Sequence, residues 1–289
     1  MKVKVFLVSS FAETAKGGNA AGVVLDADGL NEDNRKKIAK IIGYSETAFV
    51  SKSEVADFKV RFFTPSEEVD LCGHATIATF HTLADQVRIQ PDNYTQETKA
   101  GVLKVEVKKD RTIMMSQNVP QFYEVVDKEE IAASLNISLN EMVEELPTQI
   151  VSTGLRDIIV PIKNLDALNA VNPDFDKVKG VSRKYNTIGY HLFTLETLGV
   201  AHAHTRNFAP LYNIPEESAT GTSNGALAGY LFEYGQINSI EATHLVIEQG
   251  YSMNKPSEII IELATDENNI TGVVVGGKAI SFDAVDIEI

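Results

Sequence analysis

One carboxylate in this 289-residue chain stands in a setting that suits proton transfer. Glu46 lies just before the apolar residues Ala48, Phe49 and Val50, at the start of an expected core strand. Burial strips water from a carboxylate, raises its pKa and makes it a proton shuttle near neutral pH. A surface glutamate at a strand start is the ordinary alternative for an isolated Glu. We take Glu46 as the candidate catalytic acid/base and expect its pKa to be raised.

Two turns of similar composition each open a helix of small, apolar residues. Gly73 stands immediately before the first helix, next to His74, and Gly221-Thr222 stands just before the second. Free N–H groups at a helix N-terminus bind carboxylates or phosphates, whereas plain capping by the helix's own hydroxyl side chains is the alternative for either turn alone. Because the two turns match, we predict that they face one cleft and bind the carboxylate of a substrate beside Glu46.

Two other patterns invite a binding role and support it less well. The segment from Gly17 to Gly22 lacks the glycine and lysine positions of phosphate-binding loops, so it predicts a glycine turn that leads into a strand, with Asn19 as a candidate site residue. His202 and His204 share one face of a strand, but no third metal ligand follows at a recognisable spacing. We therefore predict no metal site.

The elements that must position these residues repeat in the two halves. Strand-like segments in the first half span 3–8, 22–25, 47–50 and 58–63, and an acidic start and Gly43 bound a helix over 34–42. Segments 74–84 and 224–234 are helical and apolar on nearly every face, which is typical of a helix buried inside its domain. Each half therefore resembles strands wrapped around one buried helix.

The chain length suits two domains of roughly 140 residues. Val119-Pro120-Gln121 is the expected linker, which gives an N-terminal half over 1–118 and a C-terminal half over 119–278. The last strand, 279–289, has the option of crossing back to the first half. The predicted fold class is α+β, with each domain a curled, mostly antiparallel sheet around a central helix.

Composition excludes several classes of protein. A net charge of −14 argues against a nucleic-acid partner, because phosphate neutralisation needs clustered Lys and Arg. No apolar run approaches the roughly 20 residues of a membrane span, and the first residues alternate like a strand rather than a signal peptide. Cys72 is the single cysteine, so no internal disulfide can form, which fits a reducing compartment. We expect a cytoplasmic protein.

Several blocks, taken in order, carry a resemblance that covers essentially the whole chain. They are Gly18-Asn19-Ala20-Ala21-Gly22-Val23-Val24-Leu25, Ser45-Glu46-Thr47-Ala48-Phe49, Arg61-Phe62-Phe63-Thr64-Pro65, Asp70-Leu71-Cys72-Gly73-His74-Ala75-Thr76 and Gln249-Gly250. Together they resemble the PhzF-like family of phenazine-biosynthesis isomerases, which has the diaminopimelate epimerase and proline racemase fold. Ala20 stands where the family pattern has a proline.

The resemblance implies two pseudo-symmetric domains with the active site in the cleft between them. It also implies that Glu46 is the catalytic acid/base and His74 a neighbouring site residue, that no cofactor or metal is needed, and that the protein is a homodimer. Glu217 replaces an aspartate of the family pattern and Thr222 replaces a serine. Each keeps the functional group but changes its reach or bulk.

The leading functional hypothesis is an isomerase that moves a proton within a small anionic, carboxylate-bearing metabolite by Glu46 acid/base catalysis. A racemase with two catalytic cysteines is excluded, because Cys72 stands alone and Thr220 occupies the matching position. An epimerase or racemase that uses Glu46 stays open. So does a metabolite-binding protein without catalysis, which the altered Glu217 and Thr222 motivate.

Overall fold

The computed structural model describes residues 1–266 and 269–289, and the chain in it divides into two compact units. Unit 1 comprises Met1–Ser116 with Gly276–Ile289, and unit 2 comprises Gln117–Val275. The chain thus passes from unit 1 to unit 2 after Ser116 and returns after Val275. The predicted boundary at residue 118 lies two residues beyond the first of these points. Residues 118–120 are irregular backbone.

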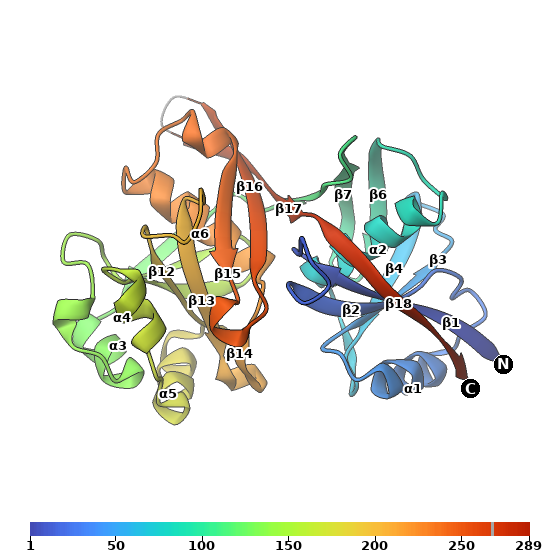
Figure 1. Ribbon diagram of the computed structural model, residues 1–289, viewed down its shortest axis with the longest axis horizontal. Helices are drawn as coiled ribbons and strands as arrows, with labels where there is room; N and C mark the ends of the chain where they lie inside the picture. The colour runs from blue at the N-terminus through green and yellow to red at the C-terminus, as the bar shows by residue number, and fades with distance from the viewer. Residues whose placement is uncertain (267–268) are drawn as a thin grey trace. The chain divides into compact units, whose positions relative to one another are not determined.

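Unit 1 is built from strands of both orientations and two helices. Its strands are β1 (Lys2–Ser10), β2 (Asn19–Val24), β3 (Thr47–Ser51), β4 (Phe58–Phe63), β5 (Glu68–Val69), β6 (Asn93–Thr98), β7 (Gly101–Val107), β8 (Ile113–Gln117) and β18 (Ala279–Glu288), and its helices are α1 (Glu32–Ile42) and α2 (Gly73–Asp85). Strand β1 pairs antiparallel with both β2 and β18. The two ends of the chain therefore lie side by side in this unit (Figure 1).

The two helices of unit 1 are held in different ways. Helix α1 is amphipathic: Asn31 caps its start, Gly43 ends it in a left-handed conformation, and Ile38 packs with Phe49 in a core on one side. Helix α2 is buried along nearly its whole length and contacts β1, β2, β3 and β18. A helix enclosed in this way needs apolar residues on every face, which is the pattern in its sequence.

Unit 2 has a larger set of helices. Its strands are β9 (Gln121–Val125), β10 (Gln149–Ser152), β11 (Arg156–Pro161), β12 (Gly189–Thr194), β13 (Ala203–Ala209), β14 (Ile214–Glu217), β15 (Leu245–Gln249), β16 (Ser257–Asp266) and β17 (Asn269–Gly277), the last of which runs on into unit 1. Its α-helices are α3 (Lys128–Leu135), α4 (Leu165–Ala170), α5 (Phe175–Tyr185) and α6 (Gly221–Glu233). Short 3₁₀ turns are η1 (Leu139–Glu141), η2 (Pro210–Tyr212), η3 (Glu241–Thr243) and η4 (Tyr251–Met253).

Both faces of strands β11 and β12 are covered by other elements, so almost every residue along these strands is buried. Ile158 and Tyr190 lie in a core shared with residues of α3 and α5. Because side chains alternate along a strand, the neighbouring residues Asp157 and His191 point the other way and bond to residues of α6. Helix α6 is thereby enclosed by its own unit, with contacts to β10, β11, β12 and β16.

The broad class of fold is confirmed: the chain mixes α and β structure in a mostly antiparallel sheet with few helices. The predicted start of the second buried helix at 224 was wrong by about one turn, since α6 begins at Gly221. Strands β6 and β14 and helix α4 were not predicted, because they are short or carry polar residues on both faces, and β15 was missed although it begins with the apolar residues 245–247. None of the helices in the described residues is long and apolar enough to span a membrane.

Candidate active site

His74 is the centre of a polar cluster in unit 1. It occupies the first turn of α2 and is only 5% exposed. Its backbone carbonyl accepts a hydrogen bond of 2.6 Å from Ser10 Oγ at the end of β1. Its ring contacts Asn19 Nδ2 and Ser45 Oγ, each at 3.4 Å. Segments far apart in the sequence therefore fix both the backbone and the imidazole of this residue.

Glu46 and Cys72 complete the cluster around the imidazole. Oε2 of Glu46 lies 3.2 Å from Nε2 of His74, with the Glu46 side chain 16% exposed. The contact between the Glu46 carboxylate and the His74 ring is classed as an ion pair rather than a hydrogen bond, since Oε2 has no hydrogen-bond partner of ordinary geometry within the described residues. Sγ of Cys72 lies 3.4 Å from Nδ1 and 3.8 Å from Nε2 of the same ring. A carboxylate, an imidazole and a thiol thus meet at the start of α2.

The protonation states of this cluster follow from mutual charge. Burial alone would raise the pKa of Glu46, but the adjacent His74 ring brings it below its usual value. Burial alone would lower the pKa of His74, but Cys72 and Glu46 hold it well above its usual value. Burial, and then the Glu46 charge, raises the pKa of the Cys72 thiol, which is enclosed although the residue as a whole is partly exposed. Near neutral pH these directions favour a Glu46 carboxylate beside a protonated His74 ring, and because a neutral Cys72 thiol carries no charge, Glu46 supplies the charge that holds the ring proton.

The predicted raised pKa of Glu46 was therefore wrong. The neighbouring sequence gave the burial correctly, and burial does act in the predicted direction. His74, 28 residues further along the chain, supplies the opposing charge at 3.2 Å. A carboxylate beside an imidazolium is ionised before the reaction begins, whereas a carboxyl group of raised pKa would be partly protonated.

We expect His74→Gln to remove one phase from the pH dependence of stability. The ionised Glu46 side chain adds to the free energy of unfolding above its unfolded pKa of 4.5, and this stabilisation is lost as pH falls through its lowered folded pKa. The protonated His74 ring adds to the free energy of unfolding below its unfolded pKa of 6.5, and this stabilisation is lost as pH rises through its raised folded pKa. Urea unfolding of the wild type should show this alkaline loss, and His74→Gln should not. His81→Gln, an imidazole change on the same helix, should retain it; its disappearance there would contradict the assignment.

The two other sequence-predicted residues of unit 1 lie against this cluster. Asn19 begins β2 and contacts Nδ1 of His74, and Gly18 before it has φ of +76°, a conformation that side chains rarely adopt. Gly73 is the first residue of α2, and its N-cap Cys72 makes no side-chain cap. No side-chain oxygen caps the first turn of α2, where the Ala75 N–H faces the Cys72 thiol, and an uncapped first turn is what an anion site requires.

In unit 2, the start of α6 is organised by Gln249 at the end of β15. Its Oε1 accepts from Thr220 N at 3.1 Å and from Asn224 Nδ2 at 2.7 Å. Its Nε2 donates to Glu217 O at 2.8 Å and to Thr220 Oγ1 at 3.1 Å. One amide side chain therefore ties together β14, the N-cap of α6 and the first turns of that helix.

The remaining predicted residues surround this helix start. Glu217 is partly exposed and accepts a hydrogen bond of 2.8 Å from Thr220 Oγ1, and the Thr220 hydroxyl does not cap α6. Gly221 is buried as the first residue of the helix, and Thr222 follows it, half-buried, with its carbonyl bonded to Thr153 Oγ1. The helix therefore starts without a side-chain cap, as α2 does.

Sequence reasoning missed Asp157, which lies beneath the first turn of α6. It is 1% exposed, and its Oδ2 accepts a hydrogen bond of 2.6 Å from Ser223 Oγ. Burial raises the pKa of Asp157 to about 7, against the Ser223 hydrogen bond and with a further push from the Glu217 charge. The sequence of β11 does not single out Asp157 by an alternation of apolar and polar residues, since the strand is buried on both faces.

Asp157→Asn should stabilise the protein at pH 8. The unfolded carboxyl titrates near 3.8 and the folded one near 7, so stability falls as pH rises between these values. Asparagine keeps an acceptor for Ser223 and carries no charge. We expect a gain of about 1–4 kcal/mol in urea unfolding at pH 8, at roughly 1.4 kcal/mol per unit of pKa, and little change near pH 4. The exposed Asp166→Asn is the matched control; an equal gain at both pH values would contradict the explanation.

The two histidines considered as metal ligands serve other contacts. His202 Nδ1 accepts from Val246 N at 3.2 Å, and His204 Nδ1 lies 2.8 Å from Glu248 Oε2. His204 also packs against the Tyr251 ring, at 5.0 Å between centroids. The pairing of each histidine with β15 or the turn after it accounts for their positions in the fold.

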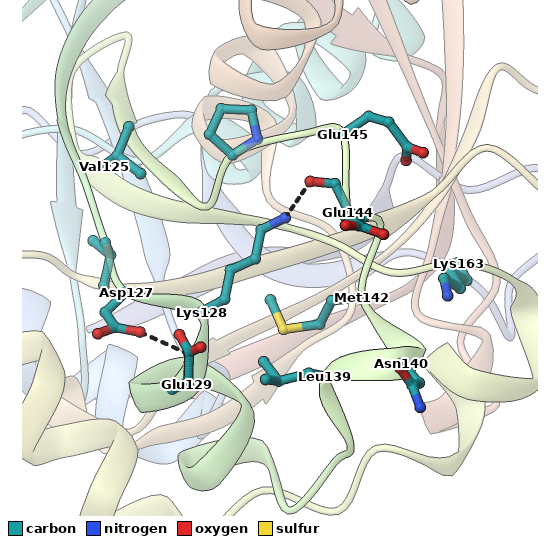
Figure 2. A pocket seen from close by; sticks show the side chains of 12 residues that line it. Val125, Asp127, Lys128, Glu129, Leu139, Asn140, Met142, Glu144, Glu145 and Lys163 are labelled. Carbon is teal, nitrogen blue, oxygen red and sulfur yellow. Dashed lines mark hydrogen bonds between the residues drawn. The ribbon is translucent and has the colours of Figure 1, made fainter.

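A cavity of about 920 Å³ in unit 2 contains none of these residues. It is lined by residues of 125–147 and by Lys163 (Figure 2). The ammonium group of Lys128, which lines the cavity, donates to the carbonyls of Val143 and Glu144 at 2.7 and 2.8 Å. This cation therefore already has hydrogen-bond partners within the protein. The cavity offers no arrangement of acid, base or anion-binding groups comparable with the cluster around His74.

Comparison with known proteins identifies the family of the chain. The profile of the PhzC-PhzF family, described as phenazine biosynthesis-like protein, matches residues 8–284. The chain belongs to the PhzC-PhzF family. An uncharacterized isomerase of Clostridium acetobutylicum is 36% identical, with 96% of each chain covered. A crystal structure of a Bacillus anthracis PhzF-family protein has a TM-score of 0.90 and 33% identity, with both chains covered completely.

The Pseudomonas fluorescens protein named trans-2,3-dihydro-3-hydroxyanthranilate isomerase is a more distant relative. It is 27% identical, with 96% of both chains covered. Both of these relatives of the PhzC-PhzF protein described here are named as isomerases. The prediction of a PhzF-like isomerase is confirmed for the family and the enzyme class.

Proposed function

We propose that this protein moves a proton between two carbons of a small carboxylate-bearing substrate, with Glu46 as the acid/base. The observation that carries the proposal is the Glu46 carboxylate, mostly buried and 3.2 Å from the imidazole of His74. A mostly buried ion pair of this kind needs a reason, because desolvation offsets much of its stabilising effect. A positioned base for a carbon-bound proton is such a reason.

The charge state of the pair defines the catalytic cycle. The Glu46 carboxylate removes a proton from one carbon and becomes a neutral carboxyl group beside an imidazolium. The lowered pKa of Glu46 makes that carboxyl a strong donor, so it returns the proton to a second carbon on the same face. No proton is gained or lost overall. The imidazolium of His74 also stabilises negative charge that develops on the substrate.

A carboxylate-bearing substrate is supported by two features. Both α2 and α6 begin without a side-chain cap, which leaves first-turn N–H groups for an anion. The Pseudomonas fluorescens relative is named for a ring that bears a carboxylate. We therefore propose a small carboxylic acid, with an unsaturated ring acid as the first choice for screening.

Helices α2 and α6 are also the basis for proposing pseudo-symmetric domains. Each has 13 residues, begins at a glycine, lacks a side-chain cap and is buried along most of its length. Two copies of one ancestral unit would account for these shared properties. The shared cleft, the homodimer and the cytoplasmic location stay predictions.

The test is a panel of cyclic and acyclic carboxylic acids incubated with the protein in deuterated water and followed by mass spectrometry. We expect carbon-bound deuterium and a rearranged product for at least one unsaturated acid. Loss of optical activity without rearrangement would instead indicate an epimerase. Tight ligands that never exchange a proton would contradict catalysis and favour a binding protein.

A further inference from the structure

We propose that Glu46, Cys72 and His74 also form a binding site for zinc, and that the bound ion switches the enzyme off. Among the residues that the structure describes, these three form a group of metal-ligating side chains in which one ligand atom from each residue lies within 4.8 Å of the other two. The inhibitory part of the inference rests on the proposed role of Glu46 as the base. The binding part does not.

The spacing of the ligand atoms suits a tetrahedral ion. Zinc bonds of about 2.3 Å to sulfur and about 2.0–2.2 Å to nitrogen and oxygen place such ligands roughly 3.3–3.6 Å apart. His74 Nε2 lies 3.2 Å from Glu46 Oε2 and 3.8 Å from Cys72 Sγ. Small rotations of these side chains would bring the three atoms to coordination distance without any backbone movement.

The chemistry of the ligand set selects a particular class of ion. A thiolate and an imidazole favour zinc over the hard cations magnesium and calcium, which prefer oxygen. The thiolate and the carboxylate together balance the charge of a divalent ion. Binding displaces the thiol proton and the extra imidazole proton to solvent. With Nε2 on the metal, Nδ1 carries the ring proton and would donate it to the Asn19 amide oxygen after a flip of that amide, whose nitrogen now lies 3.4 Å from Nδ1.

Three protein ligands leave one coordination position open, which is the arrangement of sites that exchange their ion or bind a further ligand. The Glu46 side chain is partly exposed, so an ion has access to the cluster from this side, although the Cys72 thiol itself is enclosed. Bound zinc would hold the Glu46 lone pair that the proposed reaction needs for the proton. We infer reversible inhibition that a chelator relieves.

The test is calorimetric titration of chelator-treated protein with zinc chloride in the absence of any substrate. We expect one zinc ion per chain, with binding at least about 100-fold weaker in Cys72→Ser, because even outer-shell changes cost 10–100-fold in metal affinity. Cobalt should give a sulfur-to-metal charge-transfer absorption in the wild type that Cys72→Ser lacks. His81→Gln removes an imidazole from the same helix outside the cluster and should bind zinc normally.

Equal zinc affinity in the wild type and Cys72→Ser, or no binding to the wild type at micromolar zinc, would overturn the site. Binding in Cys72→Ser together with loss in His81→Gln would place the ion elsewhere. Deuterium exchange without zinc binding would refute only the zinc site. Zinc binding with no exchange on the whole panel of acids would refute only the proposed isomerase.

Discussion

Glu46→Gln should lower the rate of deuterium exchange into a substrate by about 10²–10⁴-fold, the usual contribution of a positioned general base. Glutamine keeps the shape of the side chain and its contact with His74 but cannot accept a carbon-bound proton. Because the loss falls on the chemical step, the effect should appear in kcat rather than in KM. Exchange measured by mass spectrometry reports it directly once the panel has supplied a substrate.

Glu54→Gln is the matched control, since this glutamate is exposed on a loop and lies outside the cluster. Its exchange rate should equal that of the wild type. Ligand affinity should persist in Glu46→Gln, which separates loss of catalysis from loss of folding. Exchange in Glu46→Gln within about threefold of the wild type would mean that another group removes the proton.

The same variant separates a catalyst from a binding protein, and the product separates an isomerase from an epimerase. An epimerase that uses Glu46 would lose inversion as completely as an isomerase loses rearrangement, so the product rather than the loss distinguishes them. A binding protein without catalysis would show no exchange before or after the change. The ion pair with His74 bears on this choice, because a module that only binds an anion gains nothing from a buried negative charge in its site.

The position of Glu46 was predictable from sequence, but its electrostatics were not. The burial of Glu46 follows from the apolar residues directly after it in the sequence, so a short segment is enough to predict it. Its pKa depends on His74, which the fold brings to 3.2 Å from 28 positions away. The contact of Cys72 with the same imidazole has no sequence signature either, because the residues at 72 and 74 face one another only through the geometry of the helix start.

The network at α6 shows the same limit in unit 2. Matching glycine turns predicted a second helix start correctly. Gln249, which bonds to Thr220 and Asn224, comes from β15, a short strand that the hydrophobic pattern did not reveal. Asp157 was hidden by the burial of both faces of β11. Long-range pairing decides such contacts, and periodicity in one segment carries no information on it.

Gly189→Ala should destabilise the protein by about 3 kcal/mol or more. Gly189 begins β12, and a Cβ there would lie 1.8 Å from the carbonyl oxygen of Phe208 on the adjacent strand β13. Backbone cannot yield as a flexible side chain does, so β12 must move away from β13. That shift would also disturb His191, which bonds to Asn207 on β13 and Asn224 on α6 at 3.0 and 3.1 Å. Urea unfolding should show the midpoint falling steeply.

Gly180→Ala supplies the opposite result from the same substitution in the same unit. Gly180 is exposed in the middle of α5, and an added Cβ there meets no atom within 4 Å. Alanine favours a helix interior by about 0.5–1 kcal/mol over glycine, so this variant should be more stable than the wild type. If Gly189→Ala lost less than about 1 kcal/mol, β12 and β13 would not pair as closely as the structure has them. The support that these strands give to the start of α6 would then need another explanation.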